Sequence, residues 1–314
     1  MTPGRALLFS VFCMLGVALS GPVPLLGVAV TAFAAEVLFV NGRSTLVYIC
    51  VVLGACCCAS FGPSTALTVL VVGLACVFTA KVCAGVPSQG RLVAIGVLQI
   101  LLTIAVDLVF ATMSGSTLWD LVGRSYDQQV QYLVSNGVFG ADQQEVAQSM
   151  RDQVVGLWPV IYLFQGFVLT GISVFISLFS RRRTDFAYRS QVPPFAQFDF
   201  SPHIVWPIIA GLVCIALSYA SQDWAVAFKG AGITLIVAGW FLVFVQGLAL
   251  VEALIKRTRM PVAAAVLMWI AALALELITQ IVSLFGLLDI WINFRHLPRV
   301  GSKYEQQNRG QNGA

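Results

Sequence analysis

The chain has 314 residues, of which 59% are hydrophobic and only 10% are charged, and its formal net charge is +4. Soluble domains carry about 25% charged residues, so this composition excludes a water-soluble globular protein and requires a lipid bilayer as the solvent. The small net charge gives no reason to expect nucleic acid as a partner. We expect an all-α, polytopic integral membrane helix bundle.

Nine apolar stretches, separated by polar or Gly/Pro-containing turns, predict about nine transmembrane helices, with eight as the alternative. Several are close to the lower limit of about 17 residues for a crossing, so we expect helix tilt or local thinning of the bilayer. The nine stretches are Met1–Ser20, Leu25–Val40, Ser44–Ala59, Ser64–Ala84, Arg91–Met113, Val154–Phe179, His203–Tyr219, Ala225–Ile255 and Pro261–Arg295.

The first stretch ends in small residues, Ala18 to Gly21, which also fit the cleavage site of a signal peptide. Because further apolar spans follow at once, we interpret it as an ordinary first transmembrane helix.

The fifth stretch carries Gln99, Thr103 and Asp107 at positions i, i+4 and i+8. On a helix these side chains form one polar stripe. The segment that follows, Ser114–Gln153, is polar and mildly acidic, and its apolar residues recur at helical spacing. We expect one or two amphipathic helices there, lying on the bundle or at the membrane interface on the extracytoplasmic side.

The last apolar stretch contains a second polar stripe, made of Glu276, Thr279, Gln280 and Ser283. Their spacing of i, i+3, i+4 and i+7 places them on one face of a continuous helix. A carboxylate in mid-bilayer costs roughly 2.5–3.5 kcal/mol on insertion scales. Such a residue usually faces other helices or a water-filled cavity rather than lipid.

Basic residues indicate the orientation of the chain. With the N-terminus in the cytoplasm, the inner side holds eleven of them and the outer loops hold Arg124, Arg151 and Lys229. This topology fits the cytoplasmic membrane of a bacterium. One conflict remains, because nine crossings place a tail with Arg295, Arg299, Lys303 and Arg309 outside. Either the last segment is not a simple crossing, or one earlier short span is re-entrant.

In this topology Asp107 and Glu276 lie at similar depths, about 22–24 Å from the inner end of their helices. The two stripes are candidates for lining one outward-facing cavity, which makes Gln99, Thr103, Asp107, Glu276, Gln280 and Ser283 candidate solute-binding residues. The alternative is that each carboxyl is protonated and hydrogen-bonded across a helix interface. Glu36 lies near the inner face with Arg43 seven residues away, and we expect no special role for it.

The sequence contains no pattern typical of catalysis, a metal site or a cofactor site. There is no Gly-x-Ser-x-Gly elbow, no His-Glu-x-x-His and no phosphate-binding glycine loop. All eight cysteines lie in apolar runs, which favours small packed hydrophobes over disulfides or zinc ligands. We expect neither an enzyme nor a bound cofactor.

Four short segments resemble the YybS-like family of bacterial membrane proteins of unknown function. They are Phe195–Pro207, Phe244–Leu248, Gly286–Asp289 and Asn293–Arg295. That family is distantly similar to the S components of energy-coupling-factor vitamin transporters. The resemblance implies a bundle of six spans with an outer pocket, followed by three added spans. The small-residue pattern on which S components dock has only a weak counterpart here, Gly16 and Ser20, which puts coupling to an ATPase in doubt.

Asp289 and Arg295 are candidates for an ion pair that fixes the end of the last helix, or for a contact with lipid phosphate. The expected organisation is five helices in 1–113, an extracytoplasmic amphipathic loop in 114–153, four helices in 154–295 and a polar disordered tail in 296–314. The expected function is small-solute binding or transport. The alternative is a structural or partner-binding membrane scaffold.

Overall fold

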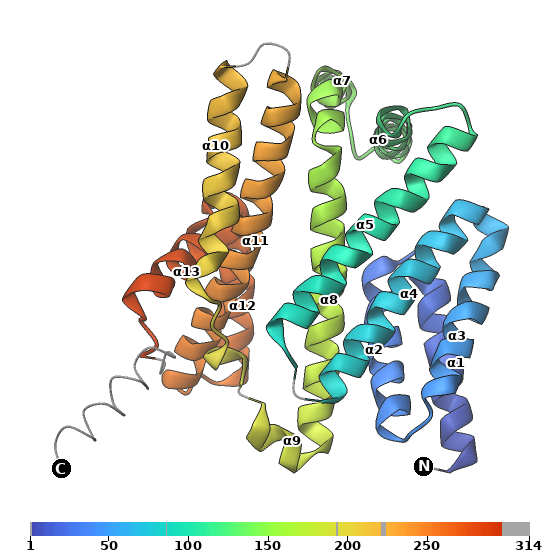
Figure 1. Ribbon diagram of the computed structural model, residues 1–314, viewed down its shortest axis with the longest axis vertical. Helices are drawn as coiled ribbons and strands as arrows, with labels where there is room; N and C mark the ends of the chain where they lie inside the picture. Colours follow the sequence, from blue (N-terminus) through green and yellow to red (C-terminus); the bar gives the residue numbers. More distant parts are fainter. Residues whose placement is uncertain (1, 86, 193, 221–223, 297–314) are drawn as a thin grey trace. The chain divides into compact units, whose positions relative to one another are not determined.

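The computed structural model describes residues 2–85, 87–192, 194–220 and 224–296, and every regular element in these ranges is a helix (Figure 1). The expected all-α class is confirmed. The chain divides into two compact units, Met1–Val192 and Pro193–Ala314, and each is described by itself. This boundary falls between the sixth and the seventh predicted spans.

Unit 1 contains the first six predicted spans and the polar segment between the fifth and the sixth. Proline occupies the first turn of α1, α2, α4 and α8, where its missing N–H group breaks no helical hydrogen bond. The helices are α1 (Pro3–Leu19), α2 (Pro24–Val40), α3 (Ser44–Cys57), α4 (Pro63–Ala84), α5 (Gln89–Met113), α6 (Leu118–Ser135), α7 (Ala141–Gly156), α8 (Trp158–Thr184) and α9 (Phe186–Gln191).

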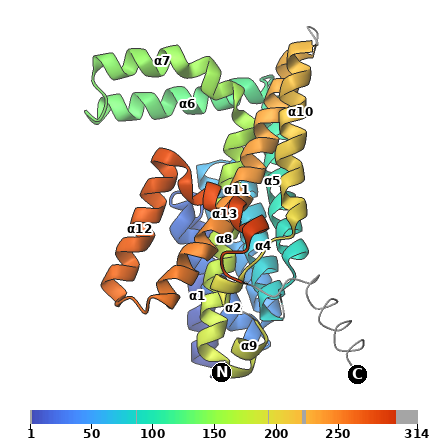
Figure 2. The same cartoon turned by 90° about the vertical axis from the view of Figure 1, so that its left-hand side faces the viewer.

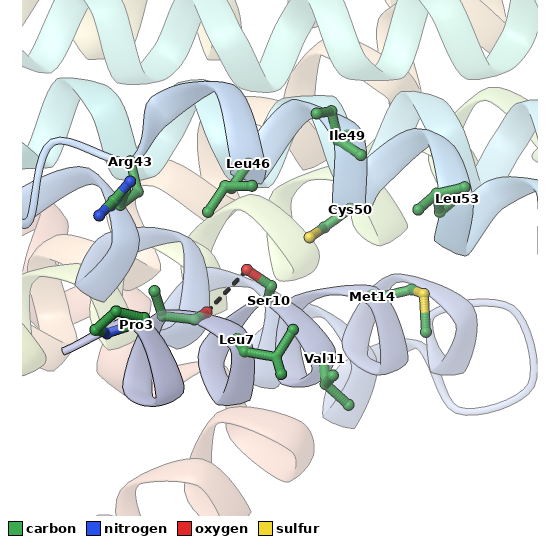
Figure 3. A pocket seen from close by; sticks show the side chains of 11 residues that line it. Pro3, Leu7, Ser10, Val11, Met14, Arg43, Leu46, Ile49, Cys50 and Leu53 are labelled. Carbon is green, nitrogen blue, oxygen red and sulfur yellow. Dashed lines mark hydrogen bonds between the residues drawn. The ribbon is translucent and has the colours of Figure 1, made fainter. Parts of the chain in front are cut away.

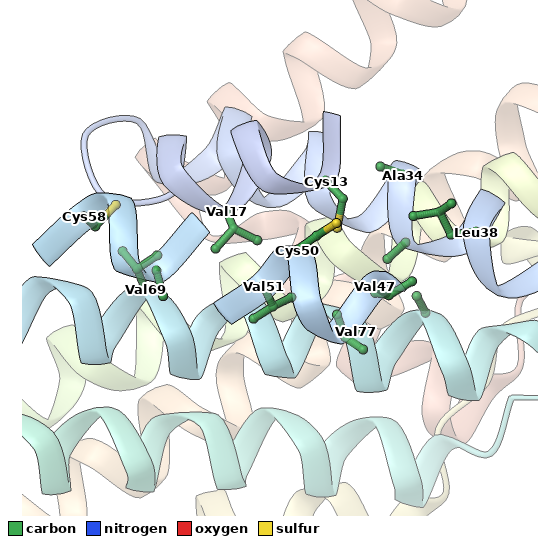
Figure 4. Packing of buried hydrophobic residues seen from close by; sticks show 13 residues of the cluster. Cys13, Val17, Ala34, Leu38, Val47, Cys50, Val51, Cys58, Val69 and Val77 are labelled. Carbon is green, nitrogen blue, oxygen red and sulfur yellow. The ribbon is translucent and has the colours of Figure 1, made fainter. Parts of the chain in front are cut away.

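The core of unit 1 lies between α1, α2, α3 and α4 and consists mainly of small and β-branched side chains (Figure 4). Val17, Leu38, Val47, Val51 and Val77 are completely buried in it. Three cysteines, Cys13, Cys50 and Cys58, take part in the same packing. Small side chains let the helix backbones approach closely, which is how helices associate in a membrane.

The closest approach in this core is between α1 and α2. A Cβ atom added to Gly16 would lie 2.7 Å from the backbone nitrogen of Thr31, and one added to Gly27 would lie 2.5 Å from the Cα of Ser20. The small residues of α1 therefore pack against α2 inside the unit.

The polar segment forms two amphipathic helices, α6 and α7, as expected. They lie side by side, across the end of α8 (Figure 2). Thr117 and Asp120 form a capping box at the start of α6. The two helices are joined by the Arg151–Asp127 ion pair at 2.8 Å and by a 2.8 Å hydrogen bond from the Tyr126 hydroxyl to the carbonyl of Ala147.

Unit 2 contains the predicted seventh and eighth spans as α10 and α11, which run side by side (Figure 1). Helix α12 has little of its surface covered, since only Ala272 of this helix is buried. Helix α13 packs instead on α11, with Gly247 and Gly286 facing each other at the contact. A Cβ atom on either glycine would collide with the other helix. The helices are α10 (Trp206–Ala220), α11 (Ala225–Arg257), α12 (Val262–Thr279) and α13 (Ile281–Ile292).

The prediction of one continuous ninth helix is wrong. The chain breaks at Gln280, whose φ of 53° is left-handed, and α12 ends there while α13 begins. In an apolar environment the Glu276 carboxylate requires hydrogen-bond donors. The break supplies two, because the backbone N–H of Ser283 donates to Glu276 at 3.0 Å and the Ser283 hydroxyl donates to its other oxygen.

Seven described helices are long and apolar enough to cross a membrane, namely those that include α3, α4, α5, α8, α10, α11 and α12. Helices α1, α2 and α13 are shorter apolar helices. With 12 residues, α13 is about 18 Å long and does not span a bilayer core of about 30 Å by itself. The structure thus supports the alternative that the last segment is not a simple crossing. The predicted disordered tail, with Arg299, Lys303 and Arg309, lies outside the described residues apart from its first residue.

Candidate functional site

Unit 1 has a partly open cavity of about 290 Å³ at the end of the unit where α6 lies. Its wall comes from the turn between α1 and α2, the first turns of α4, and parts of α5, α6 and α8. Val72 and Leu169 contribute apolar surface. The polar lining residues are Ser20, Ser64, Thr65, Thr68, Ser125 and Gln165, together with Asp107.

Asp107 is the one charged residue among those that line this cavity. It is half-buried, and it accepts a short hydrogen bond from the hydroxyl of Tyr162 on α8. The Tyr162 ring is held edge-on by Trp158, with 5.9 Å between ring centroids. One carboxylate oxygen is therefore fixed by a rigid aromatic donor, and hydroxyl and amide groups surround the carboxylate.

Gln99 and Thr103 belong to the same helix as Asp107 but do not line the cavity. Both are buried against α8. The Thr170 hydroxyl donates to the side-chain oxygen of Gln99 at 2.9 Å, and the Thr103 hydroxyl donates to the backbone carbonyl of Gln99, also at 2.9 Å. Gln99 thus joins α5 to α8, as polar groups commonly do between membrane helices, whereas the Thr103 hydroxyl is bonded within α5.

The other three candidate residues, Glu276, Gln280 and Ser283, lie in unit 2. Glu276 and Ser283 bond to each other across the helix break, and Gln280 is the exposed residue at the break. A carboxylate at a helix N-terminus is electrostatically favourable, so Glu276 acts as a cap for α13. Neither unit alone brings the two predicted stripes together.

A second polar cluster in unit 2 surrounds Arg295, whose side chain is 3% exposed. Its guanidinium donates to Asp289 at 2.6 Å and to the carbonyls of Ala196 and Phe198 at 3.0 and 2.7 Å. The predicted Asp289–Arg295 ion pair is present. The Gln246 side chain extends the cluster, because its amide donates to Asp289 at 3.2 Å and to Asp199 at 2.7 Å.

The profile of one protein family, described as "Predicted membrane protein (DUF2232)", matches residues 7–290, which is nearly the whole chain. The chain belongs to the DUF2232 family. It matches no curated protein and no solved structure.

In this DUF2232 protein, the short segments that carried the sequence resemblance meet in the Arg295 cluster. Asp199 lies in the first segment, Gln246 in the second, Asp289 in the third and Arg295 in the last. Within unit 2 the cluster ties the chain before α10 to the middle of α11 and to the end of α13. It is closed by internal hydrogen bonds, so we interpret it as a structural element of the fold.

Sequence reasoning missed a buried charge in unit 1. Glu36 on α2 is 1% exposed, and its partner is not Arg43, as the sequence spacing indicated, but Arg181 on α8. The Arg181 Nε and the Glu36 Oε1 are 4.0 Å apart. The two residues are 145 positions apart in the chain, so no local spacing could reveal the pair.

Unit 1 also has a groove of about 400 Å³ between α1 and α3 (Figure 3). Its walls are mostly apolar, and the hydroxyl of Ser10 is already bonded to the carbonyl of Ala6 at 2.9 Å. Arg43 is its one charged residue. Such a surface suits lipid chains rather than a polar solute. Among the described residues, no group of three or more His, Cys, Asp or Glu side chains could hold a metal ion.

Proposed function

We propose that this DUF2232 protein binds a small solute in the cavity at Asp107 and serves as the solute-binding component of a membrane transport system. The observation that supports this proposal best is a carboxylate that is fixed by Tyr162 and lines a cavity together with five hydroxyl side chains and the amide of Gln165. Ligand pockets combine apolar walls with a few convergent polar groups, typically in about 300–1,000 Å³. The cavity of about 290 Å³ fits the small end of that range.

The lining also defines the chemical class of the solute. Asp107 is balanced by no Lys or Arg among the lining residues. A bound molecule that presents an amine or another strong hydrogen-bond donor would satisfy the carboxylate, whereas an anion would be repelled. We therefore propose a small, polar, cationic or donor-rich solute.

The expected topology supports transport from the outside. Helix α8 ends in Arg181, Arg182 and Arg183, at the end of the helix remote from the cavity. With the basic end in the cytoplasm of a bacterial cell, the cavity opens on the outer side. The similarity to S components implies the same side. The packing of Gly16 against α2 gives no support for ATPase docking through that part of α1.

The test is to purify the protein, denature it, and identify the small molecules it releases by mass spectrometry. Asp107→Asn should reduce the recovered solute at least about tenfold, as expected for the loss of a charge-assisted hydrogen bond. Asp152→Asn is the matched control, because the side chain of Asp152 is 86% exposed on α7. Equal recovery from the wild type and from Asp107→Asn would reject the proposal.

The alternative, a partner-binding scaffold, is supported by one observation. Four large hydrophobic residues on α6, on α7 and in the turn between them have between 51% and 68% of their surface exposed. They are Tyr132, Val138, Val146 and Met150. If these side chains hold a partner protein, replacing them with serine should abolish its co-purification and leave solute recovery unchanged.

A further inference from the structure

A buried row of polar groups runs through unit 1 where α2, α4 and α8 pack together. It contains Glu36 on α2, Thr79 on α4, and Ser173 and Ser177 on α8, and each of these residues is at most 1% exposed. Both carboxylate oxygens of Glu36 and the hydroxyls of Thr79 and Ser177 accept or donate no hydrogen bond to other described residues. We call this row the polar seam.

The polar seam destabilises the folded state, because burying a polar group without a hydrogen bond costs free energy. Nearly all buried polar groups in proteins are hydrogen-bonded, so the seam is unusual. The ion pair does not remove that cost for Glu36. Its 4.0 Å separation from Arg181 is longer than a hydrogen bond. The carboxylate therefore retains acceptor capacity inside the bundle.

The seam begins about one helical turn below the cavity, beneath an apolar layer. Leu169 lines the cavity and packs against Val28, Val72 and Cys76 to form that layer. Ser173, Ser177 and Arg181 follow Leu169 along α8 in steps of four residues, so they lie on neighbouring positions of one face. On α4, Cys76 and Thr79 follow Val72 in the same direction, toward Cys83 and Glu36.

We propose that Glu36 is a proton-binding residue reached through the polar seam, and that its protonation is coupled to occupancy of the Asp107 cavity. The coupling rests on the proposed solute-binding function, whereas proton binding stands without it. In the binding step a proton from water enters through the cavity side and forms an O–H bond on the Glu36 carboxylate. The proton donor is a hydronium ion, whose O–H bond breaks as the carboxyl O–H bond forms, so that a water molecule is left and no electron is transferred.

The surroundings of Glu36 favour a proton over a metal cation. The Arg181 guanidinium would repel a sodium ion placed at the same carboxylate, whereas a proton neutralises Glu36 covalently. The other titratable groups facing Glu36 are Cys83 on α4 and Tyr188 on α9. On α1, which also packs on α2, the titratable residue of the core is Cys13, and its thiol bonds to that of Cys50 on α3.

Arg181 gives protonation a structural consequence at the inner end of the unit. Its Nη2 also lies 3.0 Å from Asp185, the N-cap of α9, and its guanidinium lies 5.5 Å from the Tyr188 ring centre. The Tyr188 hydroxyl bonds to the carbonyl of Cys83 at 2.6 Å. When Glu36 is neutral, Arg181 loses the charge of Glu36 and keeps its contacts with Asp185 and with the Tyr188 ring of α9.

The experiment is an infrared pH titration of the full-length protein in lipid nanodiscs, from about pH 8 to about pH 5, which follows the C=O band of protonated carboxyl groups. We expect a titrating band that is lost in Glu36→Gln and restored, at a shifted midpoint, in Glu36→Asp. Glu252→Gln is the matched control, because Glu252 pairs with Lys256 on the surface of α11. A band unchanged in Glu36→Gln, or one that responds to sodium chloride but not to choline chloride at fixed pH, would overturn the proposal.

Two further readouts separate this proposal from the proposed function. Asp107→Asn should lose the co-purified solute yet keep the Glu36 band. In the wild type the amount of solute retained after washing should differ severalfold between about pH 8 and about pH 5, and Glu36→Gln should remove that difference. A pH dependence that persists in Glu36→Gln would overturn the coupling and leave solute binding intact. If Glu36→Gln does not fold, Glu36→Asp still tests the proposal, since an unshifted band would contradict it.

Discussion

The two units differ in how many hydrogen-bond donors they supply to the acids in their apolar helices. In unit 2, Glu276 receives two hydrogen bonds from Ser283, and Asp289 is bonded by Gln246 and Arg295. In unit 1, Asp107 receives one side-chain hydrogen bond, from Tyr162, in a cavity wall, and Glu36 accepts none from the described residues. A carboxylate in an apolar helix is therefore not by itself a sign of a binding site. What distinguishes a structural acid is that the fold supplies its donors.

The largest effect should come from breaking the Arg295 cluster. Arg295→Met leaves the fully buried Asp289 without its cation, and removing one partner of a buried ion pair costs about 3–5 kcal/mol. We expect that loss in the free energy of unfolding, measured by denaturant titration in mixed micelles. The double variant Asp289→Asn/Arg295→Met should recover part of it, because the fully buried carboxylate is then removed together with its cation. Equal losses in the single and double variants would show that Asp289 is not the reason for the cost.

The sequence predicted the helical class, the positions of the apolar helices and the amphipathic pair α6 and α7, because these follow from composition and periodicity. It also predicted the Asp289–Arg295 pair, whose members are six residues apart. The break at Gln280 was missed because no glycine or proline marks it. A spacing of i, i+3, i+4 and i+7 is compatible with two structures, a polar stripe on one continuous helix and a cap across a helix break. The sequence alone does not distinguish them.

The second prediction compares the two acids that the sequence could not tell apart. Glu276→Gln weakens the cap of α13 and should destabilise the protein by about 1–2 kcal/mol. Asp107→Asn keeps the shape of the cavity wall and should change stability by less than about 1 kcal/mol while it removes solute binding. Both variants are measured by the same denaturant titration. A reversed order, with Asp107→Asn the more destabilising, would make Asp107 the structural acid.

The cavity and the polar seam could be predicted from the sequence only in part. Asp107 was identified because a carboxylate inside an apolar helix is costly, but its hydrogen-bond partner Tyr162 lies on another helix, as does Gln165 of the cavity wall. For Glu36 the sequence showed only that Arg43 is seven residues away, and no special role was expected. Packing of α2 against α8 brings Arg181 to Glu36 instead. Contacts between helices depend on tertiary packing, which periodicity does not encode.

The smallest effect is expected at Asp127 on α6, an acid whose side chain is partly exposed. Its hydrogen bond and ion pair with Arg151 hold the pKa of the Asp127 carboxyl below its ordinary value. The stabilisation of the α6–α7 contact is therefore fully present above the unfolded pKa of about 3.9, and it is lost as pH falls through the lower, folded value. Hydrogen exchange of the α7 amides should accelerate in that acid range, beyond the intrinsic pH dependence.

Asp127→Asn is the control for this last effect, because the amide cannot titrate and the contact should then be weak at every pH. High salt should reduce the difference between the two proteins, since the Arg151–Asp127 pair is only partly buried. The wild type and Asp127→Asn could instead show the same hydrogen-exchange protection of α7 from neutral to acid pH. In that case the Tyr126–Ala147 hydrogen bond and apolar packing would hold the two helices together. The charge of Asp127 would then contribute nothing to stability, unlike the charges of the hydrogen-bonded acids of unit 2.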